Sequence, residues 1–348
     1  MRRILICLIS LALLLSACAR TPAPADSEAG EREVRSLEAM DTFMSLTACG
    51  AHRTEALDAA EAEIRRLEAL FSIGSPESEI SLLNQAGEGV LSADTRALVG
   101  RALELYDETD GRFDITVLPL MDLWGFTSGD YQVPSEAQLA DALAAVGADS
   151  LTYQPETGAL ALGKGQAVDL GGIAKGYTSD RVMELYRAAG VTSGLVSLGG
   201  NVQCLGTRPD GSPWRIGIQD PEGVSGAMVA VIEVADQAVI TSGGYERYFV
   251  DESTGITYQH ILDPSTGMPV ANDLTSVTIV SPDGTLADGL STALYIMGLE
   301  EATDYWRAHS DAFQAVFIDG AGQIYVTEGL AASVTPAAGK AEFTVLKA

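Results

Sequence analysis

One stretch constrains the fold more than any other part of the chain: Val168-Asp169-Leu170-Gly171-Gly172-Ile173-Ala174-Lys175-Gly176-Tyr177. A short apolar approach precedes it and a helical pattern follows, so we expect a strand, a Gly-Gly turn and a helix with Lys175 in its first turn. Glycines let a backbone approach a ligand closely, and a helix N-terminus presents unpaired N–H groups to an anion. The stretch therefore favours a phosphate or pyrophosphate site, although such a Gly-Gly pair is often only a tight turn.

Two common nucleotide-binding motifs are excluded by spacing. A P-loop ends in Gly-Lys-Ser/Thr, whereas Gly176 is followed by Tyr177 and Thr178. The dinucleotide pattern G-x-G-x-x-G is absent here and at Gly199-Gly200-Asn201. Helices and strands also alternate irregularly along the chain. We therefore predict an α+β fold with mixed, largely antiparallel sheets and packed helices, and not a Rossmann fold.

Hydrophobic periodicity and turn signals predict the individual elements. Helices are expected over residues 54–71, 94–108, 174–190, 285–297 and 300–308, and a capping box at Ser135 and Gln138 begins another. Strands are expected over residues 39–47, 113–118, 194–205, 214–219, 228–234, 238–242, 245–250, 274–280, 315–318 and 324–327, with shorter strands between 151 and 168.

The N-terminus has the form of an export signal. Arg2 and Arg3 precede an apolar run that is too short to span a membrane and ends in Leu15-Ser16-Ala17-Cys18. We interpret residues 1–17 as a lipoprotein signal peptide and residues 18–36 as lipidated Cys18 with a flexible tether. Residues 37–348 then form the functional domain, lipid-anchored to a bacterial membrane and facing the periplasm or cell exterior. An ordinary secretory signal with an incidental cysteine is the alternative.

Charge and cysteine content limit the partners. The net charge is −27 and no basic stretch exists, which argues against nucleic-acid binding. A protein this acidic that binds a polyanion is expected to recruit a cation.

Cys49 and Cys204 remain after the signal and anchor cysteines, and they either pair in an oxidising compartment or stay as buried thiols.

Three further groups carry candidate chemistry. Asp288 and Thr292 are four residues apart on a predicted helix, so their oxygens share a face suited to Mg²⁺ or Ca²⁺, or Asp288 only complements the helix dipole. His260 follows a predicted strand and could move protons or simply bond to the turn. Trp124 and Phe126 flank Gly125 and could stack on a planar ring, although such a cluster is more often core.

Eight ordered runs together resemble the ApbE family of FAD:protein FMN transferases, from about Met40 to Thr327. The runs are Met40 to Met44; Ser78 to Asn84; Phe113 to Phe126; Asp169 to Tyr177; Ser197 to Asn201; Thr241 to Tyr245; His260 to Gly267; and Ala287 to Ala293.

The resemblance implies an enzyme that binds FAD with Mg²⁺. A threonine hydroxyl of a target flavoprotein attacks the FMN-side phosphorus, FMN becomes esterified, and AMP leaves. By similarity, Asp288 and Thr292 ligate Mg²⁺ through side-chain oxygens and Gly172 through its carbonyl, and His260 is the candidate for proton transfer. The remaining implied FAD-binding residues are Met40, Leu123, Trp124, Gly125, Phe126, Asp169, Lys175 and Ile261.

Two other functions use the same residues. A metal-dependent FAD pyrophosphatase would replace the threonine with water and release FMN and AMP. A non-catalytic flavin-binding lipoprotein would need no proton-transfer group. The chain also departs from the family at Gly74, where an aromatic residue is frequent, and at Asn201, where Asp is more usual; neither departure is expected to touch the metal site.

Overall fold

The computed structural model describes residues 31–224, 226–340 and 342–348. The predicted signal peptide and Cys18 lie outside these residues. Within the described ranges, no helix combines the length and the apolar character needed to cross a membrane.

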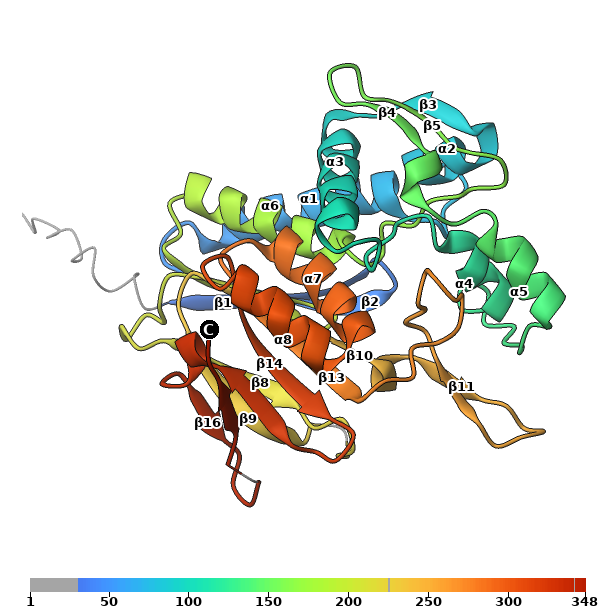
Figure 1. The fold of residues 1–348 in the computed structure, drawn as a ribbon. Helices are drawn as coiled ribbons and strands as arrows, with labels where there is room; N and C mark the ends of the chain where they lie inside the picture. The colour runs from blue at the N-terminus through green and yellow to red at the C-terminus, as the bar shows by residue number, and fades with distance from the viewer. Residues whose placement is uncertain (1–30, 225, 341) are drawn as a thin grey trace, which may run out of the picture.

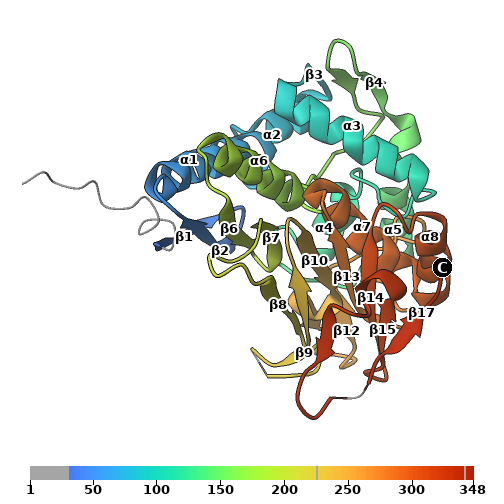
Figure 2. The ribbon, with the colours of Figure 1, turned by 90° about the vertical axis from the view of Figure 1, so that its left-hand side faces the viewer.

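A nine-stranded sheet in the order β1-β2-β6-β7-β10-β13-β14-β15-β17 forms the centre of the fold (Figure 2). Neighbouring strands are antiparallel except β15 and β17, which are parallel. The strands are β1 Arg32–Ala39, β2 Thr42–Cys49, β6 Ser193–Leu198, β7 Asn201–Leu205, β10 Ala238–Gly243, β13 Leu274–Ser281, β14 Gln314–Asp319, β15 Ile324–Thr327 and β17 Thr344–Leu346.

Helices cover one face of this sheet and a smaller sheet covers part of the other (Figure 1). The covering helices are α1 Arg53–Phe71, α6 Ala174–Ala188, α7 Gly284–Met297 and α8 Leu299–Ala308. The smaller sheet has the order β16-β9-β8 and consists of β8 Trp214–Gln219, β9 Met228–Val234 and β16 Val334–Pro336.

The alternation along the central strands explains this layering. In β14, Ala315 and Phe317 pack into the core beneath the helices, whereas Val316 and Ile318 pack against the smaller sheet. Successive side chains of a strand point to opposite faces, so one apolar run contributes to two cores. The prediction of an α+β, largely antiparallel fold is confirmed.

Two further groups of elements extend from the central layers (Figure 1). One contains α2 Glu79–Ala86, α3 Ala93–Glu108, and a sheet formed by β3 Glu88–Val90, β4 Thr152–Gln154 and β5 Ala159–Ala161. The other contains α4 Leu118–Trp124, α5 Glu136–Leu143 and a hairpin of β11 Tyr248–Val250 and β12 Thr257–Gln259. Three short 3₁₀ turns complete the described chain: Ala148–Ser150, Gly244–Glu246 and Glu328–Leu330. The capping box at Ser135 and Gln138 is present at the start of α5.

The N-terminal boundary prediction is wrong for residues 32–36. They belong to β1, which pairs with β2 over its whole length and turns at Met40 and Asp41. Charge on this edge strand concealed it in the sequence. Arg35 is half-buried on the same face as Leu37 and Ala39 and bonds Asp58 of α1 at 2.5 Å, while Leu37 and Ala39 are buried.

The strand prediction for residues 113–118 is also wrong. Asp114 accepts hydrogen bonds from the backbone N–H and the hydroxyl of Thr116, at 2.7 and 2.6 Å. Such local side-chain bonds favour a turn over a strand. Helix α4 then begins at Leu118 with Pro119 in its first turn, where a missing N–H costs nothing.

Candidate active site

Asp288 is a buried carboxylate held between two helices and a hairpin. It lies in α7 and is 4% exposed. Its Oδ2 accepts from the backbone N–H of Gly176 in α6, and its Oδ1 accepts from Nδ2 of Asn201 in β7, both at 2.8 Å. Burial raises the pKa of Asp288, while the charge of Lys175 and these donors oppose the rise. The surroundings therefore favour a cation beside this carboxylate.

Helices α6 and α7 cross closely enough at this point that only glycine fits. A Cβ on Gly176 would lie 2.2 Å from the carbonyl oxygen of Gly284 and 2.6 Å from Cβ of Asp288. The close approach is what brings the N–H of Gly176 to the Asp288 carboxylate. The Gly-Gly-x-x-Lys-Gly sequence thus serves helix packing as well as any ligand.

Hydroxyl groups gather one turn further along α7. Thr292 is half-buried, and its Oγ1 lies 3.3 Å from Oγ of Ser242, which lies near the end of β10 and also bonds Ser291 at 2.8 Å. The spacing of Asp288 and Thr292 therefore places both on one side of α7, as predicted. Ser242 belongs to the run Thr241 to Tyr245 and was not among the predicted site residues.

Asn201 is the residue that sequence reasoning misplaced. It was expected to lie away from the metal site, yet it contacts Asp288 directly. The β6–β7 hairpin turns at Gly199 and Gly200, both with positive φ, and delivers Asn201 to the buried carboxylate. No local pattern in the sequence indicates this contact between residues 87 positions apart.

These oxygens fit Mg²⁺ by their chemistry. A carboxylate has about four lone-pair positions, so Asp288 retains acceptor capacity beyond its two hydrogen bonds. Within the described residues, no group of three or more His, Cys, Asp or Glu side chains could hold a metal. A single carboxylate with hydroxyls and a carbonyl suits Mg²⁺, which usually keeps waters and substrate phosphates as its other ligands. Gly172 lies in the turn before α6, and its role as a carbonyl ligand stays a prediction.

Lys175 lies near the acidic groups that surround this region. Its ammonium donates to the carbonyl oxygen of Gly171 at 3.2 Å. Burial raises the pKa values of Asp169, Glu246 and Asp288, and the charge of Lys175 opposes the rise in each. Burial raises the pKa of Asp169, and the N–H of Gly171, 2.8 Å from its Oδ1, opposes the rise. Lys175 is thus one cation shared by three carboxylates. The strand predicted just before Asp169 is absent.

His260 follows β12 and is held in one orientation. Its backbone N–H and its Nδ1 both lie near the carbonyl oxygen of Arg247, at 3.0 and 3.1 Å. A carbonyl only accepts, so Nδ1 carries the proton and Nε2 is left as the acceptor. Burial lowers the pKa of His260 from 6.5 to about 4, partly opposed by its bond to Arg247. At neutral pH the ring is therefore an uncharged base.

The proposed stacking role for Trp124 and Phe126 is wrong, because both rings are fully buried. They pack with Leu120 and Leu262, and Nε1 of Trp124 donates to the carbonyl oxygen of Gly267 at 2.9 Å. The alternative interpretation as core is confirmed. The core still serves the site, because Phe126 accepts a hydrogen bond from the guanidinium of Arg247, the residue that holds His260.

The other predicted FAD-binding residues lie in different parts of the fold. Leu123 is half-buried and Gly125 has φ 79° at the end of α4. Ile261 is 6% exposed and belongs to the main core. Met40 lies in the β1–β2 turn with φ 49°, and its sulfur is 3.7 Å from the hydroxyl of Thr178 in α6. Their contacts with FAD stay predictions.

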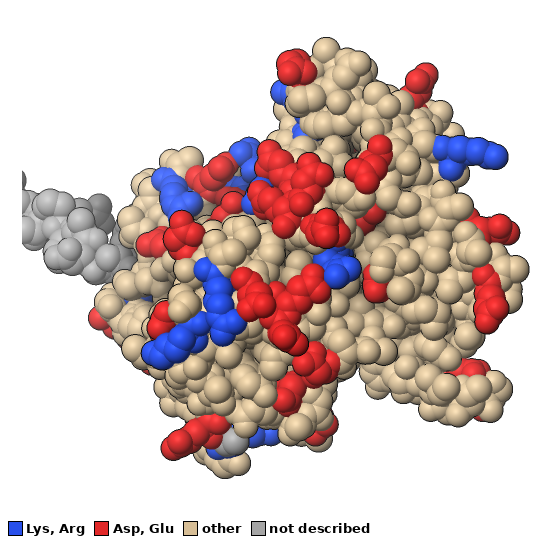
Figure 3. Space-filling view, viewed as in Figure 1, with Lys and Arg blue, Asp and Glu red and all other residues tan. Residues whose placement is uncertain are grey.

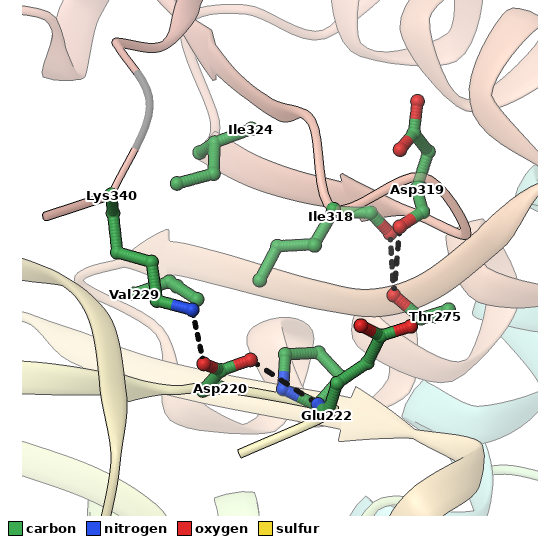
Figure 4. Close-up of a pocket in the computed structure, with 10 residues that line it drawn as sticks. Asp220, Glu222, Val229, Thr275, Ile318, Asp319, Ile324 and Lys340 are labelled. Carbon is green, nitrogen blue, oxygen red and sulfur yellow. Dashed lines mark hydrogen bonds and ion pairs between the residues drawn. The ribbon is translucent and has the colours of Figure 1, made fainter.

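A small pocket elsewhere does not belong to this site (Figure 4). Asp220 forms an ion pair with Lys340 there and accepts from the N–H of Glu222. Thr275 donates to the carbonyl oxygens of Ile318 and Asp319 at 3.1 and 3.2 Å. These polar groups are satisfied by one another. Among the residues that the structure describes, Cys49 and Cys204 are buried thiols and do not pair with each other.

Comparison with known sequences and structures agrees with this geometry. The model of the ApbE family matches residues 40–317. A relative from Escherichia coli K12 named FAD:protein FMN transferase is 30% identical over 326 residues, which cover 90% of this chain and 92% of the relative. A relative of the same name from Vibrio cholerae is 37% identical over 229 residues, which cover 64% and 68%.

Solved structures give the same result. The ApbE protein of Thermotoga maritima superposes with a TM-score of 0.82 at 30% identity, covering 87% of this chain and 99% of that one. The flavin transferase ApbE from Vibrio cholerae superposes with a TM-score of 0.76 at 30% identity, covering 86% and 98%. The family resemblance seen in the sequence is confirmed, and the chain belongs to the ApbE family.

Proposed function

We propose that this chain transfers FMN from FAD to a threonine hydroxyl of an acceptor flavoprotein, releasing AMP, with Mg²⁺ in the site. The observation that carries the proposal is the buried Asp288 carboxylate, with Thr292 and Lys175 beside it and uncharged His260 nearby. Phosphoryl transfer depends on positioning and on neutralising charge, and this arrangement offers both. The names of the relatives from E. coli and V. cholerae support the same reaction.

Asp288, Thr292 and the carbonyl of Gly172 would hold Mg²⁺, which supplies charge neutralisation on the pyrophosphate when bound. Gly176 and Asn201 keep the Asp288 carboxylate in place through their two hydrogen bonds. Lys175 adds a positive charge at the start of α6, where backbone N–H groups also favour an anion. Together these groups let a strongly acidic protein hold a diphosphate.

His260 would accept the proton of the attacking hydroxyl at Nε2. The carbonyl of Arg247 fixes the ring through Nδ1, and the low pKa keeps Nε2 free of a proton at neutral pH. A base held in this way can act at the moment of attack without first losing a proton. Asp169, bonded to Gly171, would help to orient FAD.

We also propose that the chain is attached to a bacterial membrane through lipid on Cys18 and faces the periplasm or cell exterior. The sequence before Cys18 supports this placement. Cys18→Ser should move the protein from the membrane fraction to the soluble fraction. An unchanged distribution would argue against the anchor.

The test of the reaction uses a chain that begins before β1, at residue 31, with FAD, Mg²⁺ and a candidate acceptor flavoprotein domain. The intact mass of the acceptor and the amount of AMP are measured together. A gain of one FMN with equal AMP supports transfer. AMP and free FMN without a mass gain would instead indicate a pyrophosphatase, and intact bound FAD would indicate a carrier. Asp288→Asn is the control that should lose the Mg²⁺-dependent product.

A further inference from the structure

The β11–β12 hairpin leads into His260 and is anchored to the body of the molecule by an aromatic face and by Gln259 at its base. Its register pairs Tyr248 with Gln259, Phe249 with Tyr258 and Val250 with Thr257. Phe249 stacks on Tyr258 and on Tyr131, with ring centroids 5.4 and 5.0 Å apart. A two-stranded ribbon is marginal by itself. Phe249 and Tyr258 also contact Trp124 of α4, so this aromatic face holds the hairpin to α4.

On the opposite face, Gln259 donates to the carbonyl oxygen of Val270 and to the hydroxyl of Tyr295, at 2.7 and 3.0 Å, whereas the apolar side chains of β11 are exposed. Tyr248 and Val250 are 52% and 50% exposed, and Ile256 beside the turn is 49% exposed. In Figure 1 the hairpin projects from the body of the molecule at the lower right, and in Figure 3 this projection is mostly uncharged apart from an acidic patch. Large apolar side chains exposed together on a projecting element mark an interaction surface.

The backbone of β11 also presents a free edge. His260 donates its N–H to Arg247, and Asp251 donates its N–H to Ile256, so these are hydrogen-bonded pairs of the ladder. Such pairs alternate with non-hydrogen-bonded pairs, whose N–H and C=O groups point away from the partner strand. Tyr248 and Val250 therefore direct their backbone groups outward, and an edge of this kind is a template for another strand.

We propose that an extended segment of the acceptor protein adds to the edge of β11, covers Tyr248 and Val250, and so delivers its threonine to His260. The proposal rests on the proposed function, which requires a protein substrate at this histidine. Strand addition supplies affinity through main-chain bonds, and the exposed side chains select the acceptor. The carbonyl of Arg247 holds His260. The distance along the strand from Val250 to Arg247 is about 10 Å.

Charge favours the same occupant over a second copy of this chain. Asp251 and Glu252 lie at the hairpin turn, and the whole chain carries a net charge of −27. Two such hairpins would repel each other edge to edge. An acceptor segment with a basic side chain just beyond the paired residues would be attracted to the turn.

The experiment compares the full chain with the double variant Tyr248→Ser/Val250→Ser, using the acceptor flavoprotein domain of the mass experiment. Both side chains are exposed, so their loss should leave the fold intact. We expect KM for the acceptor to rise at least tenfold, with the Kd for FAD unchanged and kcat at saturating acceptor within about twofold. Val90→Ser, at an exposed apolar site on β3, is the matched control and should change none of these quantities.

Val250→Pro tests the backbone pairing separately, because proline removes one outward N–H and is tolerated on an edge. It should also raise the KM for the acceptor. An unchanged KM in both variants would overturn the docking proposal while leaving the transferase standing. A dimer of the unaltered chain that the variants dissociate would overturn it in favour of a second copy. If the unaltered chain adds no FMN to the acceptor, the proposed function itself fails, and the docking proposal fails with it.

Discussion

Gly176→Ala tests how far the site depends on the close crossing of α6 and α7. The added Cβ would lie 2.2 Å from the carbonyl oxygen of Gly284, and ordinary contact begins near 3.4 Å. The helices must therefore separate locally by about 1 Å, since neither a backbone carbonyl nor Cβ of Asp288 can turn aside. Such a shift lengthens the 2.8 Å bond from Gly176 to Asp288 beyond hydrogen-bonding distance.

The expected cost combines three contributions. Overpacking in a close interior contact costs about 2 kcal/mol. Losing a hydrogen bond to a charged group costs about 2 kcal/mol more. Alanine is a better helix former than glycine by about 1 kcal/mol, which offsets part of the loss. The free energy of unfolding should thus fall by about 3 kcal/mol, which for a domain of this size lowers Tm by about 5 °C.

Thermal unfolding of the metal-free protein measures this cost, and titration with Mg²⁺ and FAD measures the effect on the site. Gly100→Ala in α3 is the matched control: its Cβ would meet Tyr153 at an ordinary 3.5 Å, so it should be neutral or slightly stabilising. If Gly176→Ala unfolds at the temperature of the unaltered chain and binds Mg²⁺ and FAD as tightly, the site does not depend on the close crossing of α6 and α7.

Three other predictions follow from the same geometry. Trp124→Phe leaves the carbonyl of Gly267 without its donor and should lower the free energy of unfolding by about 2 kcal/mol. The rate of FMN transfer should also fall. An unchanged midpoint of denaturant unfolding would contradict this prediction. Asn201→Ala removes a donor from Asp288; it should weaken Mg²⁺ binding several-fold in calorimetry and lower the free energy of unfolding of the ligand-free protein by about 2 kcal/mol. Folding lowers the pKa of His260 from 6.5 to about 4. As the pH falls from 6.5 to about 4, the unfolded chain therefore binds a proton at His260 before the folded chain does, and the free energy of unfolding decreases. His260→Gln should show a shallower loss between pH 6 and 4 in chemical denaturation, and an identical slope would show that this histidine is not responsible.

The amphipathic helices could be predicted because their burial follows their period. In α1, Leu57, Ile64 and Phe71 are buried along one face, as the spacing requires. The C-terminal strands β16 and β17 were not expected, because each spans three residues and their partners are distant in sequence. Short edge strands take their structure from what they pair with and carry little signal of their own.

Some contacts of the candidate site could likewise be predicted from the sequence, and others could not. Asp288 and Thr292 share a helix, so their proximity could be read from four-residue spacing. The contacts of Asn201 with Asp288 and of Arg247 with His260 depend on the path of the whole chain. Trp124 and Phe126 were candidates for stacking on flavin because sequence gives the type of a ring but not its burial.

The position of β1 determines how a tethered enzyme would be oriented. β1 is one edge of the nine-stranded sheet, and the β11–β12 hairpin projects from the opposite side of the molecule (Figure 1). Nine strands side by side span roughly 40 Å. A lipid at the N-terminus would thus attach the protein to the membrane at the side opposite the hairpin. His260, which follows the hairpin, would then lie away from the membrane surface. An acceptor whose threonine lies close to the membrane surface could reach His260 only if the tether allowed the domain to rotate toward the membrane.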